Sequence, residues 1–225
     1  MPYADRAYDA LLLQMISGER EPGDRLNVGA LSREMELSAT PIREALARLE
    51  PTGFVLRHPL RGYEVAPLLS PTEIGQLMDA RLLFEPSFAA EATAKATPEF
   101  LAGLLASIET MERAGALADP ETLRASWIAD ESFHSLISAQ TGNPFTQRAF
   151  AALGSQLQRF RLSGRAGRTH ALEAAAEHRG IYDAIRDGNG DRAVGLMRAH
   201  LEEARRRTLA DERATPADGP QHRAH

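Results

Sequence analysis

The chain has 225 residues, of which 43% are hydrophobic and 25% charged, as expected for a globular protein of one large or two small domains. The absence of cysteine excludes disulfides and thiolate metal sites, and a net charge of −5 argues against a general polyanion binder. The acidic start "MPYADRAYDALLLQ" is unlike a signal peptide, and no apolar run reaches membrane-spanning length. We therefore expect a cytoplasmic protein with no membrane partner.

Residues 1–68 are predicted to form a small domain of three helices and a β-hairpin. A Pro-Gly turn separates the first helix from a short second helix over 28–36. The third helix begins near Ser38 and Thr40, which we expect to cap it, and ends at Gly53. The segments "FVLR" and "GYEV" are predicted to be two strands joined by the turn "HPLRG".

This first domain is locally basic although the whole chain is acidic. Between Ser38 and Tyr63, arginines outnumber acids: Arg43, Arg48, Arg57 and Arg61 stand against Glu44 and Glu50. Contact with phosphates depends on where the arginines lie and not on the total charge. A capped amphipathic helix, a hairpin behind it and this local charge together favour DNA binding.

Residues 69–210 are predicted to form an all-helical bundle, followed by a disordered tail over 211–225. Ser70 and Glu73 have the spacing of a capping box at the start of the first helix. Proline, glycine and the period of the apolar residues give about six helices, over 71–96, 98–114, 120–140, 144–164, 171–187 and 189–210. The tail is polar and contains two prolines, so it cannot bury a core of its own.

Three of these helices carry polar residues on their apolar stripes, namely Asp130, His134, His178 and His200. A single such histidine is more often a hydrogen-bonded core residue, so a purely structural bundle is one alternative. Four buried polar groups on three helices are harder to explain in that way. Three imidazoles and one carboxylate suit a divalent metal ion: we expect zinc first, with nickel, manganese, iron or cobalt as alternatives. Glu131 and Glu177 adjoin these residues in sequence and are expected to point elsewhere.

Arg81 lies on an apolar stripe of the first bundle helix, with Leu77, Phe84 and Phe88. A buried guanidinium needs a carboxylate partner. One interpretation is a salt bridge, with Glu85 or with a residue on a neighbouring helix. The other is a clamp for a small anion beside the metal.

Taken together, the two halves resemble the GntR family of bacterial transcription regulators, in its FadR-type branch with an all-helical effector domain called FCD. The N-terminal motifs are "PGDRLN" and "LSREMELSATPIREALARLEPTGFVLRHPLRGYEVAPL". The C-terminal motifs are "DESFHSLI", "TGNP" and "EHRGIYDAIRDGNGDRAVGLMRAHL". The resemblance covers about residues 5–210, and two motif sets in the right order are more specific than either alone.

The resemblance implies a winged helix-turn-helix, in which the helix after Ser38 enters the major groove and the hairpin turn is the wing. It implies a homodimer that reads a short palindrome in double-stranded operator DNA. The metal ligands of metal-binding relatives map onto Asp130, His134, His178 and His200, and Arg81 maps onto a residue that helps to hold a small carboxylate effector.

The DNA-binding residues expected on this basis are Ser38, Thr40, Arg43, Arg48, Arg61 and Gly62. Many relatives have an arginine where this chain has Ala39, and a further basic residue where it has Gly29 and Ala30. Arg43 is therefore expected to be the main cation that reaches the bases.

The sequence thus predicts a DNA-binding regulator, a repressor, and not an enzyme. Its operator affinity is expected to respond to an organic acid bound near a metal ion in the helical domain. One alternative is a metal sensor, in which the cation itself is the signal. Another is a mononuclear metalloenzyme acting on a small carboxylate, which would leave the N-terminal domain unexplained.

Overall fold

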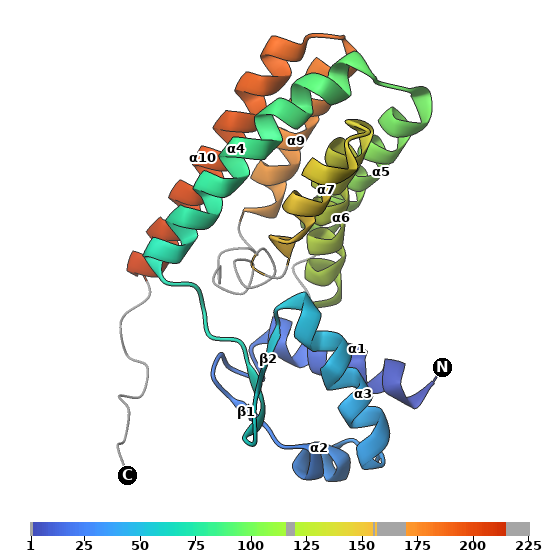
Figure 1. The fold of residues 1–225 in the computed structure, drawn as a ribbon, viewed down its shortest axis with the longest axis vertical. Helices are drawn as coiled ribbons and strands as arrows, with labels where there is room; N and C mark the ends of the chain where they lie inside the picture. The colour runs from blue at the N-terminus through green and yellow to red at the C-terminus, as the bar shows by residue number, and fades with distance from the viewer. Residues whose placement is uncertain (1, 116–119, 155, 157–169, 215–225) are drawn as a thin grey trace.

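The computed structural model describes residues 2–115, 120–154, 156 and 170–214 (Figure 1). The N-terminal segment forms a compact head of helices and one small sheet, and the rest of the described chain is helical. In Figure 1 the helical domain stands above the head, with α4 and α10 side by side along its length. None of the described helices combines the length and the apolar character needed to cross a membrane.

The head contains the three predicted helices and a sheet of three strands. Its elements are α1 (Tyr3–Ser17), β1 (Arg25–Leu26), α2 (Val28–Glu34), α3 (Ala39–Leu49), η1 (Glu50–Thr52), β2 (Val55–His58) and β3 (Gly62–Val65). The predicted hairpin is β2–β3, paired antiparallel from Val55 opposite Val65 to His58 opposite Gly62. The sequence did not predict β1, which pairs with the other edge of β3 and completes the order β1-β3-β2.

Helix α3 has the apolar stripe that the sequence predicts, and its two ends differ from expectation. Ile42, Ala45, Leu46 and Leu49 are buried against α1 and the sheet. At its start, Ser38 occupies the N-cap position without a side-chain capping hydrogen bond, so the predicted cap is wrong. At its end the backbone tightens into the 3-10 turn η1, which contains Pro51 and stops at Gly53 with φ = 82°.

The helical domain consists of α4 (Pro71–Ala94), α5 (Pro98–Gly115), α6 (Pro120–Gln140), α7 (Pro144–Ala151), α9 (Ala171–Arg186) and α10 (Gly190–Ala214). The capping box at Ser70 and Glu73 is present. The single helix predicted over 144–164 is wrong, because α7 ends at Ala151 and Ala152 and Leu153 form a turn. Helix α10 continues to Ala214, past the predicted end at 210. Residues 215–225, most of the predicted tail, lie outside the described residues.

In the core of the helical domain, α6 packs along α4 and α5, and its inward side chains reach α9 and α10. Phe133 and Ile137 of α6 are fully buried among apolar side chains from those helices. Leu104 and Ile108 of α5 close the core on one side. Burial of a Leu, Ile or Phe side chain contributes about 1.5–3 kcal/mol, so this core holds the helices in fixed positions.

The first turns of α6 pack against the head and do not face the interior of the bundle. The sequence placed Leu123 and Trp127 on one inward stripe with His134, but both pack on the apolar core of the head. The Trp127 ring stacks on Phe54, with ring centroids 6.4 Å apart. Arg124 donates a hydrogen bond of 2.9 Å to Asp9 of α1. One helix therefore connects the head to the centre of the helical domain.

Candidate metal centre and DNA-reading surface

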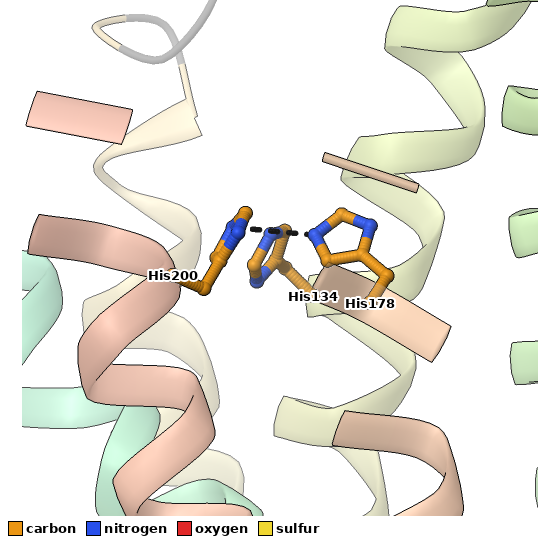
Figure 2. A group of neighbouring side chains, drawn as sticks. All are labelled: His134, His178 and His200. Atoms are coloured by element: carbon orange, nitrogen blue, oxygen red, sulfur yellow. Dashed lines mark hydrogen bonds between the residues drawn. The ribbon is translucent and has the colours of Figure 1, made fainter. Parts of the chain in front are cut away.

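Three histidines from three helices meet in the interior of the helical domain (Figure 2). His134 of α6, His178 of α9 and His200 of α10 are each at most 4% exposed. One ring nitrogen from each lies within 4.8 Å of the other two. The Nε2 atoms of His178 and His200 are 3.2 Å apart, and two imidazole nitrogens on one zinc ion would lie roughly 3–3.4 Å apart.

Carboxylates contact the far nitrogens of two of these rings. Nδ1 of His134 lies 2.5 Å from Oε2 of Glu85 on α4. Nδ1 of His200 lies 2.7 Å from Oε2 of Glu177 on α9. The contact of Glu85 with Nδ1 of His134 is an ion-pair contact without hydrogen-bond geometry. The hydrogen bond with Glu177 keeps the proton of His200 on Nδ1 and leaves its Nε2 lone pair facing the centre, which is the arrangement around protein-bound metals. The expectation that Glu177 points elsewhere is therefore wrong.

His178 is held by packing and lacks one polar partner. Its ring stacks on Phe133, with centroids 4.2 Å apart and planes at 14°. Its Nδ1 is buried and has no hydrogen-bond partner among the described residues. If Nε2 carries the proton it can donate to His200, and Nδ1 is then an unsatisfied acceptor. If Nδ1 carries the proton, two lone pairs face each other at 3.2 Å. A cation at the centre would relieve the second arrangement, so the residues present fit a metal ion.

Asp130 lies at the open edge of the histidine cluster. Its Oδ1 is 3.7 Å from Nε2 of His178 and 3.8 Å from Nε2 of His134. The side chain is 27% exposed, whereas the three imidazoles are buried. The structure thus brings together all four residues predicted as metal ligands, with the carboxylate on the solvent side.

The pKa shifts around the cluster show which groups are charged. Burial opposes ionisation of Glu85, but Arg81 and His134 outweigh it and lower its pKa to about 2. Burial also opposes ionisation of Glu177, whose pKa falls to about 2 because His200 and Arg207 donate hydrogen bonds to it. Burial lowers the pKa of His178 and of His200, and in His200 the hydrogen bond to Glu177 opposes the fall. The lowered pKa values favour neutral imidazoles at His178 and His200, which can bind a cation without first losing a proton.

Arg81 forms the salt bridge that was one of its two interpretations, and it also reaches the histidines. Its Nε donates to Oε1 of Glu85 at 2.5 Å, and both side chains are almost fully buried. Its Nη2 lies 3.2 Å from Nε2 of His134. Glu85 therefore contacts Arg81 and His134 at once, and the three residues form one buried polar unit.

A small cavity adjoins this unit. It has a volume of about 150 Å³ and is lined by polar and aromatic side chains, among them Arg81, His134, Ser135, Ser138, Gln147 and Phe150. Oγ of Ser138 is buried and has no hydrogen-bond partner in the described structure. A second cavity, of about 390 Å³, lies between the head and α6. Glu131, Ala151 and Gly154 line both cavities, so the two are neighbours.

On the head, the polar side chains at the start of α3 face solvent. Arg43 is exposed, and its side chain has no ion pair or hydrogen bond with any described residue. Ser38 and Thr40 are exposed as well, and their hydroxyl groups bond no other described side chain or backbone group. These three residues are therefore free to contact an external partner.

Arg48 is engaged within the head. Its Nη1 donates to Oδ1 of Asp5 at 2.7 Å, and its guanidinium lies over the Tyr8 ring at 4.9 Å. The hydrogen bond to Asp5 raises the pKa of Arg48. A DNA contact by Arg48 would have to compete with both interactions, so Arg43 is the more available of the two cations.

The turn between β2 and β3 projects Arg61 and Gly62 into solvent, as expected of a wing. The backbone N–H of Arg61 donates to the carbonyl of His58 at 3.1 Å and closes the turn. Gly62 has φ = 87°, a conformation that glycine adopts readily. Sequence patterns gave no signal for Leu60, which is fully exposed at the tip with φ = 65°.

A winged helix-turn-helix joined to a helical domain is the arrangement expected of a DNA-binding regulator. The family models agree with this class. The bacterial regulatory proteins of the gntR family match residues 3–65, and the FCD domain matches residues 76–203. The chain therefore belongs to the GntR family, with an FCD domain; it is a transcription regulator and not an enzyme.

Curated relatives are similar over most of their length. HTH-type transcriptional regulator LutR of Bacillus subtilis is 27% identical over 82% of this chain and 91% of its own. HTH-type transcriptional repressor GlaR of Escherichia coli is 26% identical over 86% of this chain and 90% of its own. Both are named as transcription regulators, and GlaR as a repressor.

Solved structures share the fold. A putative GntR transcriptional regulator from Rhodococcus sp. RHA1 superposes with a TM-score of 0.71 at 20% identity, covering 92% of this chain and 97% of its own. The metal-free FCD domain of the regulator TM0439 superposes with a TM-score of 0.54 at 16% identity, over 65% of this chain and 99% of its own.

Proposed function

We propose that this GntR regulator is a homodimeric, cytoplasmic repressor whose operator affinity is controlled by a small carboxylate bound beside a divalent metal ion. The observation that carries the proposal is the cluster of three buried imidazoles, two of them oriented by carboxylates, in the interior of the FCD domain. The FCD domain of TM0439 was solved in a form described as metal-free, which supports metal binding by domains of this kind.

The residues that would hold the metal are His134, His178 and His200, with Asp130 completing the set from the solvent side. Three nitrogens and one oxygen suit zinc in tetrahedral geometry, and also suit manganese, iron, cobalt or nickel with further positions for water. When bound, the metal supplies a Lewis-acidic position that a carboxylate oxygen can occupy. Phe133 keeps His178 in place, while Glu85 and Glu177 orient the other two rings.

The cavity beside Arg81 is the proposed effector site. A guanidinium at its wall suits a carboxylate, because a planar fork of N–H donors matches two carboxylate oxygens. Ser138 has an unpaired buried hydroxyl on the same wall, which favours a ligand with a further polar oxygen. The volume of about 150 Å³ favours an acid with only a few carbon atoms.

Helix α6 is the proposed connection between the two functions. It carries Asp130 and His134 at its centre, and Arg124 and Trp127 at the end that packs on the head. A ligand that binds one position of α6 more tightly than another shifts the arrangement of the heads by that difference in affinity. Ligand binding can then alter DNA affinity by moving the heads, without a conformational change inside each head.

The proposal is tested by measuring binding of the purified dimer to DNA from upstream of its own gene. Fluorescence anisotropy would compare metal-stripped protein, zinc-loaded protein, and zinc-loaded protein with a panel of small carboxylic acids. We expect sequence-specific binding that one of the acids weakens only in the presence of metal. A DNA affinity that changes with zinc but not with any of the acids would favour a metal sensor. Absence of specific binding under every condition would contradict the regulator function.

Replacing Arg43 by alanine is expected to weaken specific DNA binding by about 10- to 100-fold, the value of one bidentate contact to a guanine. Arg43 is exposed and unpaired, whereas Arg48 is held by Asp5. Arg48→Ala should therefore have a smaller effect in the same anisotropy assay. Arg186→Ala removes the same charge from the exposed end of α9 and is the control. If Arg43→Ala and Arg186→Ala lower the DNA affinity equally, Arg43 does not contact the operator specifically.

A further inference from the structure

Arg81 forms a hydrogen bond with the nitrogen atom of His134 that a metal ion would use. Its Nη2 lies 3.2 Å from Nε2 of His134, which is one of the three nitrogens that face the centre of the cluster. A guanidinium has donors only, so Nε2 of His134 must be the acceptor, and the imidazole proton lies on Nδ1, 2.5 Å from Oε2 of Glu85. Nε2 of His134 therefore carries a lone pair, and the Arg81 N–H donates to it.

One lone pair cannot serve both a guanidinium N–H and a cation about 2.0–2.1 Å away. Binding of a metal at His134 thus requires Nη2 of Arg81 to leave. Nε of the same guanidinium donates to Oε1 of Glu85 at 2.5 Å, and the second contact with Glu85, from Nη2 to Oε2, is longer at 3.4 Å. The side chain can therefore turn while the shorter contact with Glu85 is kept. Arg81 already lines the cavity of about 150 Å³, so Nη2 can move into this cavity.

A displaced Nη2 in a buried cavity needs an acceptor, because an unsatisfied buried donor on a charged group is costly. The described walls offer three neutral groups, on Ser135, Ser138 and Gln147, and one carboxylate, Glu131, which already has an interaction of its own. A bound anion is therefore the charged partner that the cavity leaves open to Arg81. Metal binding would therefore leave Nη2 of Arg81 without an acceptor, and a bound anion would supply one. In the absence of metal, His134 satisfies Arg81 and the anion site is closed.

We propose that Arg81 couples the two ligands of the site: metal binding displaces it from His134 and frees it to bind an anion, so the metal and the carboxylate bind with positive cooperativity. This inference rests on the metal and carboxylate sites proposed above. The coupling is reciprocal by thermodynamic linkage, and the carboxylate therefore tightens the metal by the same factor. Arg81 is a positioning residue here and not a metal ligand.

The test is zinc affinity, measured by competition with a chromophoric chelator, for wild type, Arg81→Lys and Arg81→Met. Lysine keeps a cation beside Glu85, but a single ammonium is not a planar fork that reaches both Glu85 and His134. We expect Arg81→Lys to bind zinc about 10-fold more tightly than wild type without added anion, because one charge-assisted hydrogen bond no longer competes. Arg113→Lys, the same change at an exposed site on α5, should leave zinc affinity unchanged.

Sodium acetate is the anion probe, with sodium chloride at equal ionic strength as its control. We expect acetate to tighten zinc binding in wild type and to have no such effect in Arg81→Met. Thermal denaturation reports whether each variant folds; if Arg81→Met does not, Arg81→Lys alone decides the matter. Zinc binding in Arg81→Lys that is equal to or weaker than in wild type would overturn the coupling and leave the metal site standing. Absence of zinc binding in wild type would instead overturn the proposed metal site, and the coupling with it.

Discussion

His178→Ala is expected to lower the zinc affinity of the protein by more than about 100-fold, and to abolish the increase in melting temperature that zinc causes. Loss of an outer-shell partner alone weakens metal binding about 10- to 100-fold, and loss of a ligand should exceed that. His178 is central because its Nε2 lies 3.2 Å from that of His200 and 3.7 Å from Oδ1 of Asp130. Equilibrium dialysis followed by elemental analysis measures the stoichiometry directly.

The matched control is His170→Ala, which removes a partly exposed imidazole at the N-cap of the same helix. It should retain one zinc ion per chain and the full thermal shift. A His178→Ala protein that also retains stoichiometric zinc would exclude His178 from the ligand set. That result would favour a bundle with purely structural histidines.

Glu85→Gln is expected to lower the free energy of unfolding of the helical domain by about 3–5 kcal/mol at neutral pH, the range for breaking a buried ion pair. Arg81 would keep its charge in the same buried site while losing its carboxylate partner. The pKa of Glu85 is about 2, below the value of about 4.3 in an unfolded chain. The carboxylate thus stabilises the fold fully above the unfolded pKa, and this contribution is lost as pH falls from about 5 towards 2.

Urea denaturation followed across this pH range measures both effects. Wild type should lose stability as the pH falls, and Glu85→Gln should show a shallower loss because one of the titrating groups is absent. Glu91→Gln is the control, since Glu91 is an exposed residue of the same helix with only a weak ion pair to Lys95. Equal stability of the two variants would show that the buried unit of Arg81, Glu85 and His134 does not support the fold.

The helix pattern and the inward direction of the three histidines could be predicted, because both are local properties of the sequence. Pro98, Pro120 and Pro144 do begin helices. His134, His178 and His200 lie on the buried stripes that their spacing predicts. The helical period of about 3.6 residues determines which side chains face inward. The interior of the bundle then leaves only one place for three inward imidazoles to meet.

The contacts that run between helices could not be predicted in this way. Glu177 precedes His178 on α9, yet it bonds His200 and Arg207, which both belong to α10. The helical period of α9 predicts the direction in which Glu177 points from α9. It does not predict which residues of α10 lie in that direction. The same holds for Glu85, whose sequence spacing indicated Arg81 but not His134.

Two further errors arose from the limits of local patterns. The apolar stripe of α6 is continuous in sequence, but its first turns extend beyond the bundle, so Trp127 packs on the head instead. Strand β1 has only two residues, which is too short for alternation of polar and apolar side chains to be visible. The DNA-reading residues remain predictions, because exposure of Arg43 shows that it is available and not what it contacts.

The central claim is that the three buried imidazoles bind a divalent metal. It is tested most directly by anomalous diffraction at the zinc edge, from crystals of the full chain grown with equimolar zinc. We predict one anomalous peak per chain, about 2.0–2.1 Å from Nε2 of His134, His178 and His200, with Oδ1 of Asp130 at about 2.0–2.2 Å. Zinc bound at another place, or three imidazoles with no peak between them, would contradict the account.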